Sequence, residues 1–180
     1  MRKRLFLAAP LALLSLLTLA ACGESDVDKF ATASLGVQHG IEKGIPIARA
    51  LRQAGKVTPE YNLRLARKAK LVNSLHRTSL DFVLAGDADG GMLYDQLQAL
   101  IKAAKDLQSD SHLGSEVLFD LGVALSETEL EDLADGLKGK RGVRLPLTAE
   151  ARAKLEQARA ASERNAQSLD EAIRQLSPTE

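Results

Sequence analysis

The side chains best suited to metal binding or acid–base chemistry are the three histidines of this 180-residue chain, His39, His76 and His112. Apolar periodicity predicts two long helices over residues 26–54 and 59–85, joined by a tight turn, which would bring His39 and His76 to nearly the same level. On a helical wheel, however, His76 lies on the apolar face of its helix, whereas His39 points about 150° away from the apolar centre of its own. We therefore expect a buried, hydrogen-bonded His76 and a solvated His39 rather than a shared metal site.

A second candidate for metal binding is the pair Asp87 and Asp89, which stand before a glycine as at the start of a calcium-binding loop. The later positions depart from that loop, because the sixth place holds Met92 instead of glycine and the twelfth holds Gln98 instead of glutamate. The sequence instead favours capping of the next helix by these aspartates. No metal site is expected.

The densest local charge is the segment from Lys138 to Arg144, which carries the four cations Lys138, Lys140, Arg141 and Arg144. Close to a membrane these cations could contact anionic headgroups or lipopolysaccharide phosphates, each contributing about 1 kcal/mol. The alternative is a solvated loop, which is the usual role of a run of like charges.

The N-terminus has the three parts of an export signal: a basic head at residues 2–4, an apolar stretch that ends at Leu19, and small residues after it. The apolar stretch is about 15 residues long and contains Pro10, so it is short of the roughly 20 residues that cross a bilayer as a helix. We predict a cleaved signal peptide at residues 1–21 rather than a permanent transmembrane helix.

The stretch Leu19-Ala20-Ala21-Cys22 resembles the lipobox of bacterial lipoprotein precursors, in which leucine and two small residues precede an invariant cysteine. The resemblance covers only the first 22 residues. It implies a diacylglycerol on the Cys22 sulfur, cleavage between Ala21 and Cys22, and an acyl chain on the new amine. Two or three acyl chains anchor a protein far more firmly than one. The alternative is a plain secretory signal, with Cys22, the only cysteine of the chain, in that place by chance.

The residue after the lipobox cysteine is Gly23 rather than aspartate. In a cell with two membranes the resemblance then implies the outer membrane, and in a cell with one membrane it implies the outer face of the plasma membrane. Residues 22–26 are predicted to be a tether of less than about 18 Å, which would hold the domain close to the membrane.

Without residues 1–21 the chain keeps 159 residues, enough for one domain with one core. It then has 21 Lys and Arg against 24 Asp and Glu, a net charge of about −3, and it has no Trp. A slightly acidic chain with few aromatic side chains is a poor polyanion binder, so no nucleic-acid partner is expected. No cofactor is expected apart from the lipid.

The remaining pattern is helical throughout. Thr58 and Thr148 are predicted N-caps, and Ser126 with Glu129 matches a capping box that would open a short helix ending near Leu137. The apolar run from Glu116 to Leu125 could be a buried helix or a buried strand, and helix is preferred because no second strand-like segment could pair with it. Further expected elements are a third helix with its apolar stripe at Leu93 to Leu107, a polar loop at 109–114 and a last helix to about Leu176.

Glycines and a proline make the first predicted helix ambiguous. Gly40, Gly44 and Pro46 could kink it, or could divide residues 26–54 into two helices. The expected fold is nevertheless all-α, an up-and-down bundle of four or five helices that forms one domain over residues 27–177.

No GxSxG, SxxK or HExxH motif occurs in the sequence. The leading functional hypothesis is therefore a non-catalytic, lipid-anchored module of the cell envelope that binds a protein or another envelope component close to the membrane. The alternatives are a carrier of a small apolar ligand or lipid inside the bundle, and an exported enzyme that uses His76 with carboxylates.

Overall fold

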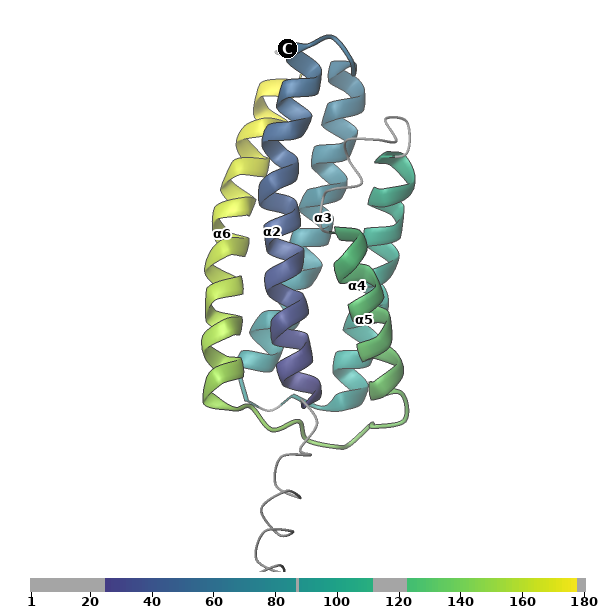
Figure 1. Cartoon of the computed structure of the whole chain (residues 1–180), viewed down its shortest axis with the longest axis vertical. Coiled ribbons are helices and arrows are strands. Elements are labelled where there is room, and N and C mark those ends of the chain that lie inside the picture. Colours follow the sequence, from purple (N-terminus) through teal and green to yellow (C-terminus); the bar gives the residue numbers. More distant parts are fainter. Residues whose placement is uncertain (1–24, 87, 112–122, 178–180) are drawn as a thin grey trace, which may run out of the picture.

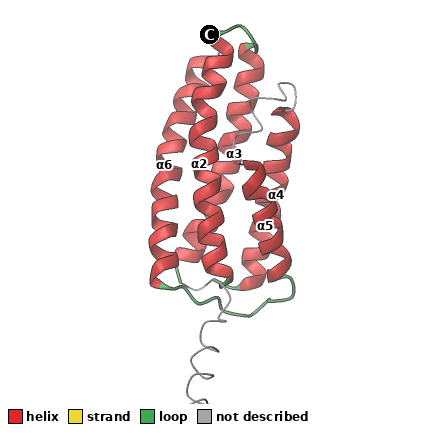
Figure 2. Cartoon of the chain, in the orientation of Figure 1, coloured by secondary structure: helices red, strands yellow, loops and turns green. Residues whose placement is uncertain are grey.

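In a computed structural model of the chain, residues 25–86, 88–111 and 123–177 are described, and they form five α-helices (Figure 1). The helices are α2 (Asp26–Gln53), α3 (Pro59–Leu84), α4 (Gly90–Ser111), α5 (Val123–Leu137) and α6 (Ala149–Leu176). Within these ranges there is no β-strand, only an isolated antiparallel bridge between Asp89 and Arg144. The predicted all-α bundle is confirmed (Figure 2).

Helices α2, α4 and α6 run in one direction and α3 and α5 in the other (Figure 1). The four helices α2 to α5 form a ring in which each packs against its two neighbours, and α6 packs against both α2 and α3. The first turn of α2 and the loop between α5 and α6 lie at one end of the bundle, which we call the strap end. The turn between α2 and α3 lies at the other end (Figure 1).

Two of the predicted N-caps, Thr58 and Thr148, are confirmed, because their hydroxyls accept hydrogen bonds from amides in the first turns of α3 and α6. Thr58 Oγ1 accepts from Tyr61 N at 3.2 Å, and Thr148 Oγ1 accepts from Ala151 N at 3.0 Å. Ser25 forms a capping box with Asp28, so the first described helix begins inside the segment that was predicted to be a tether. At the far end of α2, Gly55 takes a φ of +67°, which ends the helix.

The first helix is single, since α2 continues through Pro46 without a break. Two other boundaries were predicted wrongly. The α4 helix reaches Ser111, past the expected loop start at Ser109, and ion pairs from α3 to Asp106 and Asp110 hold its last turns.

Helix α5 begins at Val123, so Ser126 lies inside the helix and not at its N-cap. A capping-box pattern is a local signal, and the preceding Ala124 and Leu125 are strong helix formers that extend the helix across it. Of the run from Glu116 to Leu125, residues 123–125 are helical and the others lie outside the described residues, as do residues 1–24, Asp87 and His112.

The core follows the predicted stripes. Buried apolar side chains come from all five helices, and the largest of them are fully enclosed: Phe30, Leu80, Leu93, Leu97, Leu100, Leu130, Leu137, Leu155 and Leu169. The seam of α6 is also as predicted, with Ala151, Ala158 and Ser162 at 0% exposure. None of the described helices has the length and apolar character needed to cross a membrane.

The described buried polar side chains all lie on α2, α3 and α6. They are Ser34, Gln38, Asn62, Asn73, His76, Ser79, Ser162 and Asn165. The junction of these three helices is therefore a polar seam, whereas α4 and α5 cover the other side of α2 and α3 with apolar side chains.

We predict that Leu97→Ala lowers the free energy of unfolding by about 2–5 kcal/mol, because it removes a fully buried side chain from the α4 stripe. Leu71→Ala is the matched control, since Leu71 is 53% exposed and its loss should cost less than about 0.5 kcal/mol. Urea denaturation followed by circular dichroism measures both. Equal costs for the two variants would contradict this helix register.

Candidate functional site

His76, the side chain with the greatest chemical potential in the sequence, lies at the centre of the polar seam with 0% exposure. Its ring meets Phe30 edge-on, with ring centroids 6.2 Å apart. The predicted burial of His76 is confirmed, and His39 is exposed as predicted although it follows Gln38, the residue that contacts His76. The two histidines share a level in the bundle but not a face of it.

A relay of hydrogen bonds fixes the state of the imidazole. Asn165 Nδ2 donates to Gln38 Oε1 at 2.8 Å and to the Gln38 backbone oxygen at 3.0 Å. Because its Oε1 accepts from Asn165, Gln38 presents its Nε2, a donor, to His76 Nδ1 at 2.6 Å. Nδ1 is then the acceptor, and the neutral ring carries its proton on Nε2.

The other ring nitrogen, Nε2, has no hydrogen-bond partner among the described residues, and neither has the buried hydroxyl of Ser34. Burial strongly disfavours the imidazolium and lowers the pKa of His76 to about 3. The imidazole therefore stays neutral at any ordinary pH and is closed off from solvent. This arrangement can fix helix positions, but it offers no base to a substrate.

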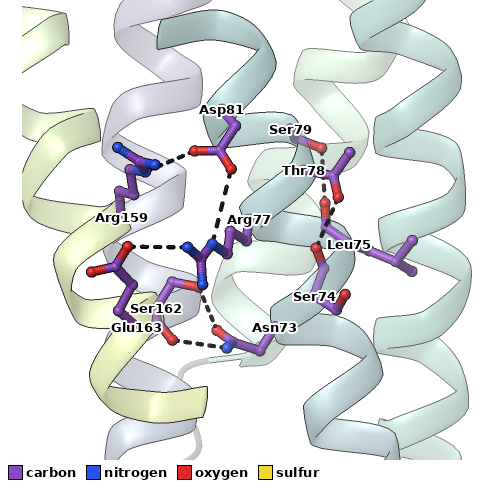
Figure 3. A network of polar contacts seen from close by, with 10 residues as sticks. All are labelled: Asn73, Ser74, Leu75, Arg77, Thr78, Ser79, Asp81, Arg159, Ser162 and Glu163. Atoms are coloured by element: carbon purple, nitrogen blue, oxygen red, sulfur yellow. Dashed lines mark hydrogen bonds and ion pairs between the residues drawn. The ribbon is translucent and has the colours of Figure 1, made fainter. Parts of the chain in front are cut away.

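Further polar contacts tie α3 to α6 (Figure 3). Asn73 Nδ2 donates to the Ser162 backbone oxygen at 2.9 Å, and Ser162 Oγ donates to Asn73 Oδ1 at 3.0 Å. Outside this buried pair, Arg77 bonds Glu163 at 3.1 Å and Arg159 pairs with Asp81 at 2.7 Å. A buried amide–hydroxyl pair thus lies beneath a surface layer of ion pairs.

The strap end holds the predicted basic loop, which is a loop in the structure. Residues 138–148 connect α5 to α6 and cross the starts of α2 and α4. Lys140 Nζ lies 2.6 Å from Asp26 Oδ2, and Thr148 Oγ1 donates to Asp28 Oδ1 at 3.0 Å. We call residues 138–148 the strap.

The strap also pairs with the turn between α3 and α4. Gly90 N donates to the Val143 oxygen at 3.0 Å, and Leu145 N donates to the Ala88 oxygen at 2.9 Å. Leu145 and Ala88 are both buried. The strap is therefore a packed part of the domain that fastens the ends of α2, α3 and α4 together.

The four predicted anion-contacting cations are brought to this end, but three of them bind the protein itself. Lys140 pairs with Asp26, Arg141 lies 3.2 Å from Asp95, and Arg144 donates to the Gly86 backbone oxygen at 3.0 Å. Lys138 has an exposed side chain. The local density of cations thus serves largely to hold the strap, a role that the sequence alone did not suggest.

Asp89 caps α4 as predicted, since its Oδ1 accepts from Gly91 N at 2.9 Å and from Met92 N at 3.1 Å. Within the described residues there is no group of three or more His, Cys, Asp or Glu side chains that could hold a metal ion. Asp87 lies outside the described residues.

The two glycines that open α4 have a packing role that the sequence analysis missed. A Cβ at Gly90 would lie 2.8 Å from the Lys140 backbone oxygen, and a Cβ at Gly91 would lie 2.9 Å from the Arg141 Cα. Only glycine lets the strap approach α4 so closely. Two features of the sequence could have indicated this contact. A Gly-Gly pair stands at the start of a helix, and the later loop that it meets contains glycines of its own.

An open groove of about 540 Å³ runs along α3 on the outer side of the bundle. Its walls are Glu60, Leu63, Arg64, Arg67, Lys68 and Leu71. Arg64 and Lys68 reach Asp110 of α4 at 3.0 and 2.9 Å, and the hydrogen bond from Lys68 lowers the pKa of Asp110 below its ordinary value. Glu60, Arg64, Arg67 and Leu71 are all exposed. Arg64 pairs with Asp110, and Arg67 lies one helical turn from Leu71, so the groove presents a cation beside an apolar side chain.

Comparisons of the chain with protein-family models, with curated proteins and with solved structures found no match.

We predict that His76→Asn flattens the dependence of stability on pH. The folded-state pKa of about 3 lies below the unfolded value of about 6.5, so the unfolded chain gains a proton first as the pH falls. The wild type should therefore lose about 2 kcal/mol of unfolding free energy between pH 7.5 and pH 5 that the variant does not lose. Parallel urea titrations at the two pH values measure the difference, and equal pH slopes would refute a buried neutral His76.

We predict opposite effects for alanine at two helical glycines. Gly136→Ala should stabilise the protein by about 0.5–1 kcal/mol, because the new Cβ meets no atom closer than Asp26 Oδ1 at 3.8 Å. Gly91→Ala should destabilise it by about 1–3 kcal/mol, because the Cβ would force the Arg141 backbone away. Thermal melts compare the two, and a stabilising Gly91→Ala would show that the strap does not pack against α4.

Proposed function

We propose that the protein is a lipid-anchored module of the cell envelope, attached through Cys22, that binds another envelope component with the outer surface of its helical bundle. In this role the protein binds its partner and catalyses no reaction. One observation carries the proposal: helix α2 begins directly after its N-cap Ser25, three residues after Cys22.

The position of Ser25 gives the lipobox a physical consequence. Three residues span at most about 11 Å, so an acylated Cys22 would hold the first turn of α2 at the membrane surface. The Ser25 capping box makes that first turn a well-defined start, because the side chains of Ser25 and Asp28 satisfy each other's backbone amides. A domain on so short a tether can meet only partners that come to the membrane.

The alternative of an enzyme that uses His76 is disfavoured by the surroundings of that side chain. A catalytic base must come within hydrogen-bond reach of its substrate, whereas the His76 ring is fully buried and its Nδ1 already accepts from Gln38. Its low pKa makes it a weak base as well.

The groove on α3 supports the binding part of the proposal. Leu71 is 53% exposed there, and the groove residues lie in the first half of α3. That half is at the end of the bundle opposite the first turn of α2 (Figure 1). An exposed apolar side chain with a cation beside it suits contact with an acidic, amphipathic surface of another protein. A partner bound there would approach from the side away from the anchor.

We predict that Cys22→Ala moves the protein from the membrane fraction to the soluble fraction, because no described helix could span the bilayer in place of the lipid. The matched control adds Lys29→Cys to Cys22→Ala, which restores a cysteine at an exposed position preceded by Asp26-Val27-Asp28 rather than by a lipobox, and it should remain soluble. Fractionation with immunoblotting, and the mass of the N-terminal peptide, measure the result. Unchanged membrane association of both variants would rule out the lipoprotein assignment.

A further inference from the structure

Two of the large apolar side chains that the described residues leave exposed lie at the strap end. Met92 is 55% exposed in the first turn of α4, and Val143 is 49% exposed in the strap. The Gly90 N to Val143 O hydrogen bond places Val143 beside the residue two positions before Met92. This is the end of the bundle at which α2 begins (Figure 1).

These side chains are held in place by rigid surroundings. The strap is fastened to α2 by Lys140 and to the start of α4 by the close approach to Gly90 and Gly91. Gly142 takes a φ of +77°, which turns the chain directly before Val143. The exposure of Val143 therefore belongs to a packed loop and not to a freely moving one.

Charge at this end is close to balanced, so it does not explain attachment to a membrane by itself. Lys140 and Arg141 are neutralised by Asp26 and Asp95, while Asp28 and Asp89 add negative charge near the same helix starts. Further exposed cations are Lys29, Lys138 and Arg144, the last of which donates to the uncharged Gly86 oxygen, and they are opposed by the exposed Asp135. What distinguishes the surface is its pair of apolar side chains.

We propose that the strap end lies on the phospholipid bilayer, with Met92 and Val143 at the boundary between headgroups and acyl chains and the helices roughly along the membrane normal. This inference rests on the proposed lipid anchor at Cys22. A tether of about 11 Å at most keeps this end within that distance of an acylated Cys22. Apolar side chains that enter the interface exchange contact with water for contact with lipid, which is favourable.

This orientation sets the height of the α3 groove. The axis of α3 rises about 1.5 Å per residue, so the segment from Leu71 to Glu60 stands roughly 20–35 Å above the C-terminal end of α3 at the bilayer. The groove then faces the compartment, where a protein partner can reach it.

The test uses the full-length lipidated protein in vesicles of phosphatidylethanolamine and phosphatidylglycerol. Lipidation consumes the only native thiol, so Met92→Cys, Val143→Cys and the control Leu71→Cys can each be labelled at one site with an environment-sensitive fluorophore. Leu71 matches the other two in exposure but lies on α3, away from the strap. Circular dichroism confirms that each labelled variant is folded.

We expect nitroxide-bearing lipids to quench the labels at 92 and 143 and to leave the label at 71 bright, and aqueous iodide to do the reverse. Labels at 92 and 143 as accessible to iodide as the label at 71 would overturn the proposed orientation. Protection that occurs in native envelope membranes but not in the pure vesicles would overturn it too, in favour of a protein cover. If the mass of the N-terminal peptide shows that the protein is acylated, either of these two outcomes overturns the orientation alone and not the lipid anchor at Cys22. An N-terminal peptide without the acyl mass would refute the proposed function itself.

Discussion

The hydrogen bond between Gln38 and His76 joins α2 to α3 in a place that solvent cannot reach, and the rest of the bundle is arranged around that constraint. A buried amide or imidazole that loses its partner costs about 1–3 kcal/mol. Asn165 brings α6 into the same relay, and Asn73 with Ser162 repeats the restriction one turn away along α6. A shift of α6 by one turn would break both sets of bonds at once. Apolar packing alone tolerates such shifts much better, so the polar seam specifies the register of the three long helices.

On the opposite side of the bundle, the register of the helices is fixed in a different way. The α4 and α5 helices are shorter than α2 and α6, and their described buried residues are apolar apart from the glycines Gly90 and Gly91. Their register is fixed at the strap end instead, where Gly90 and Gly91 admit residues 138–148 and Lys140 reaches across to α2. Buried hydrogen bonds thus fix the register of α2, α3 and α6, whereas the strap fixes that of α4 and α5. Of the three large apolar side chains exposed among the described residues, Leu71 in the α3 groove is the one that lies far from the strap.

Much of this fold could be predicted from the sequence because the signals were local. Thr58 and Thr148 mark helix starts whatever the rest of the chain does, and the wheel position of His76 predicts its burial. The pairing of its ring with Gln38 could not be predicted in that way, since the two residues are 38 positions apart and meet only through the packing of α2 against α3. Lys140 and Asp26 are separated by 114 residues, so the cations of the strap looked free in the sequence. Ser126 shows the converse error, in which a local capping signal was outweighed by the helix-forming residues before it.

The α3 helix connects the features that matter for function. It begins beside the groove, carries His76 and Asn73 at its middle, and ends at the strap end. A partner that bound the groove could move α3 along its axis only by breaking the relay and the Arg77 to Glu163 layer together, and the freed polar groups would then be buried without partners. That penalty opposes any mechanism in which binding at the groove is passed to the membrane by sliding of α3. The bundle is better suited to hold a binding surface at a fixed height above its anchor than to transmit a signal along its length.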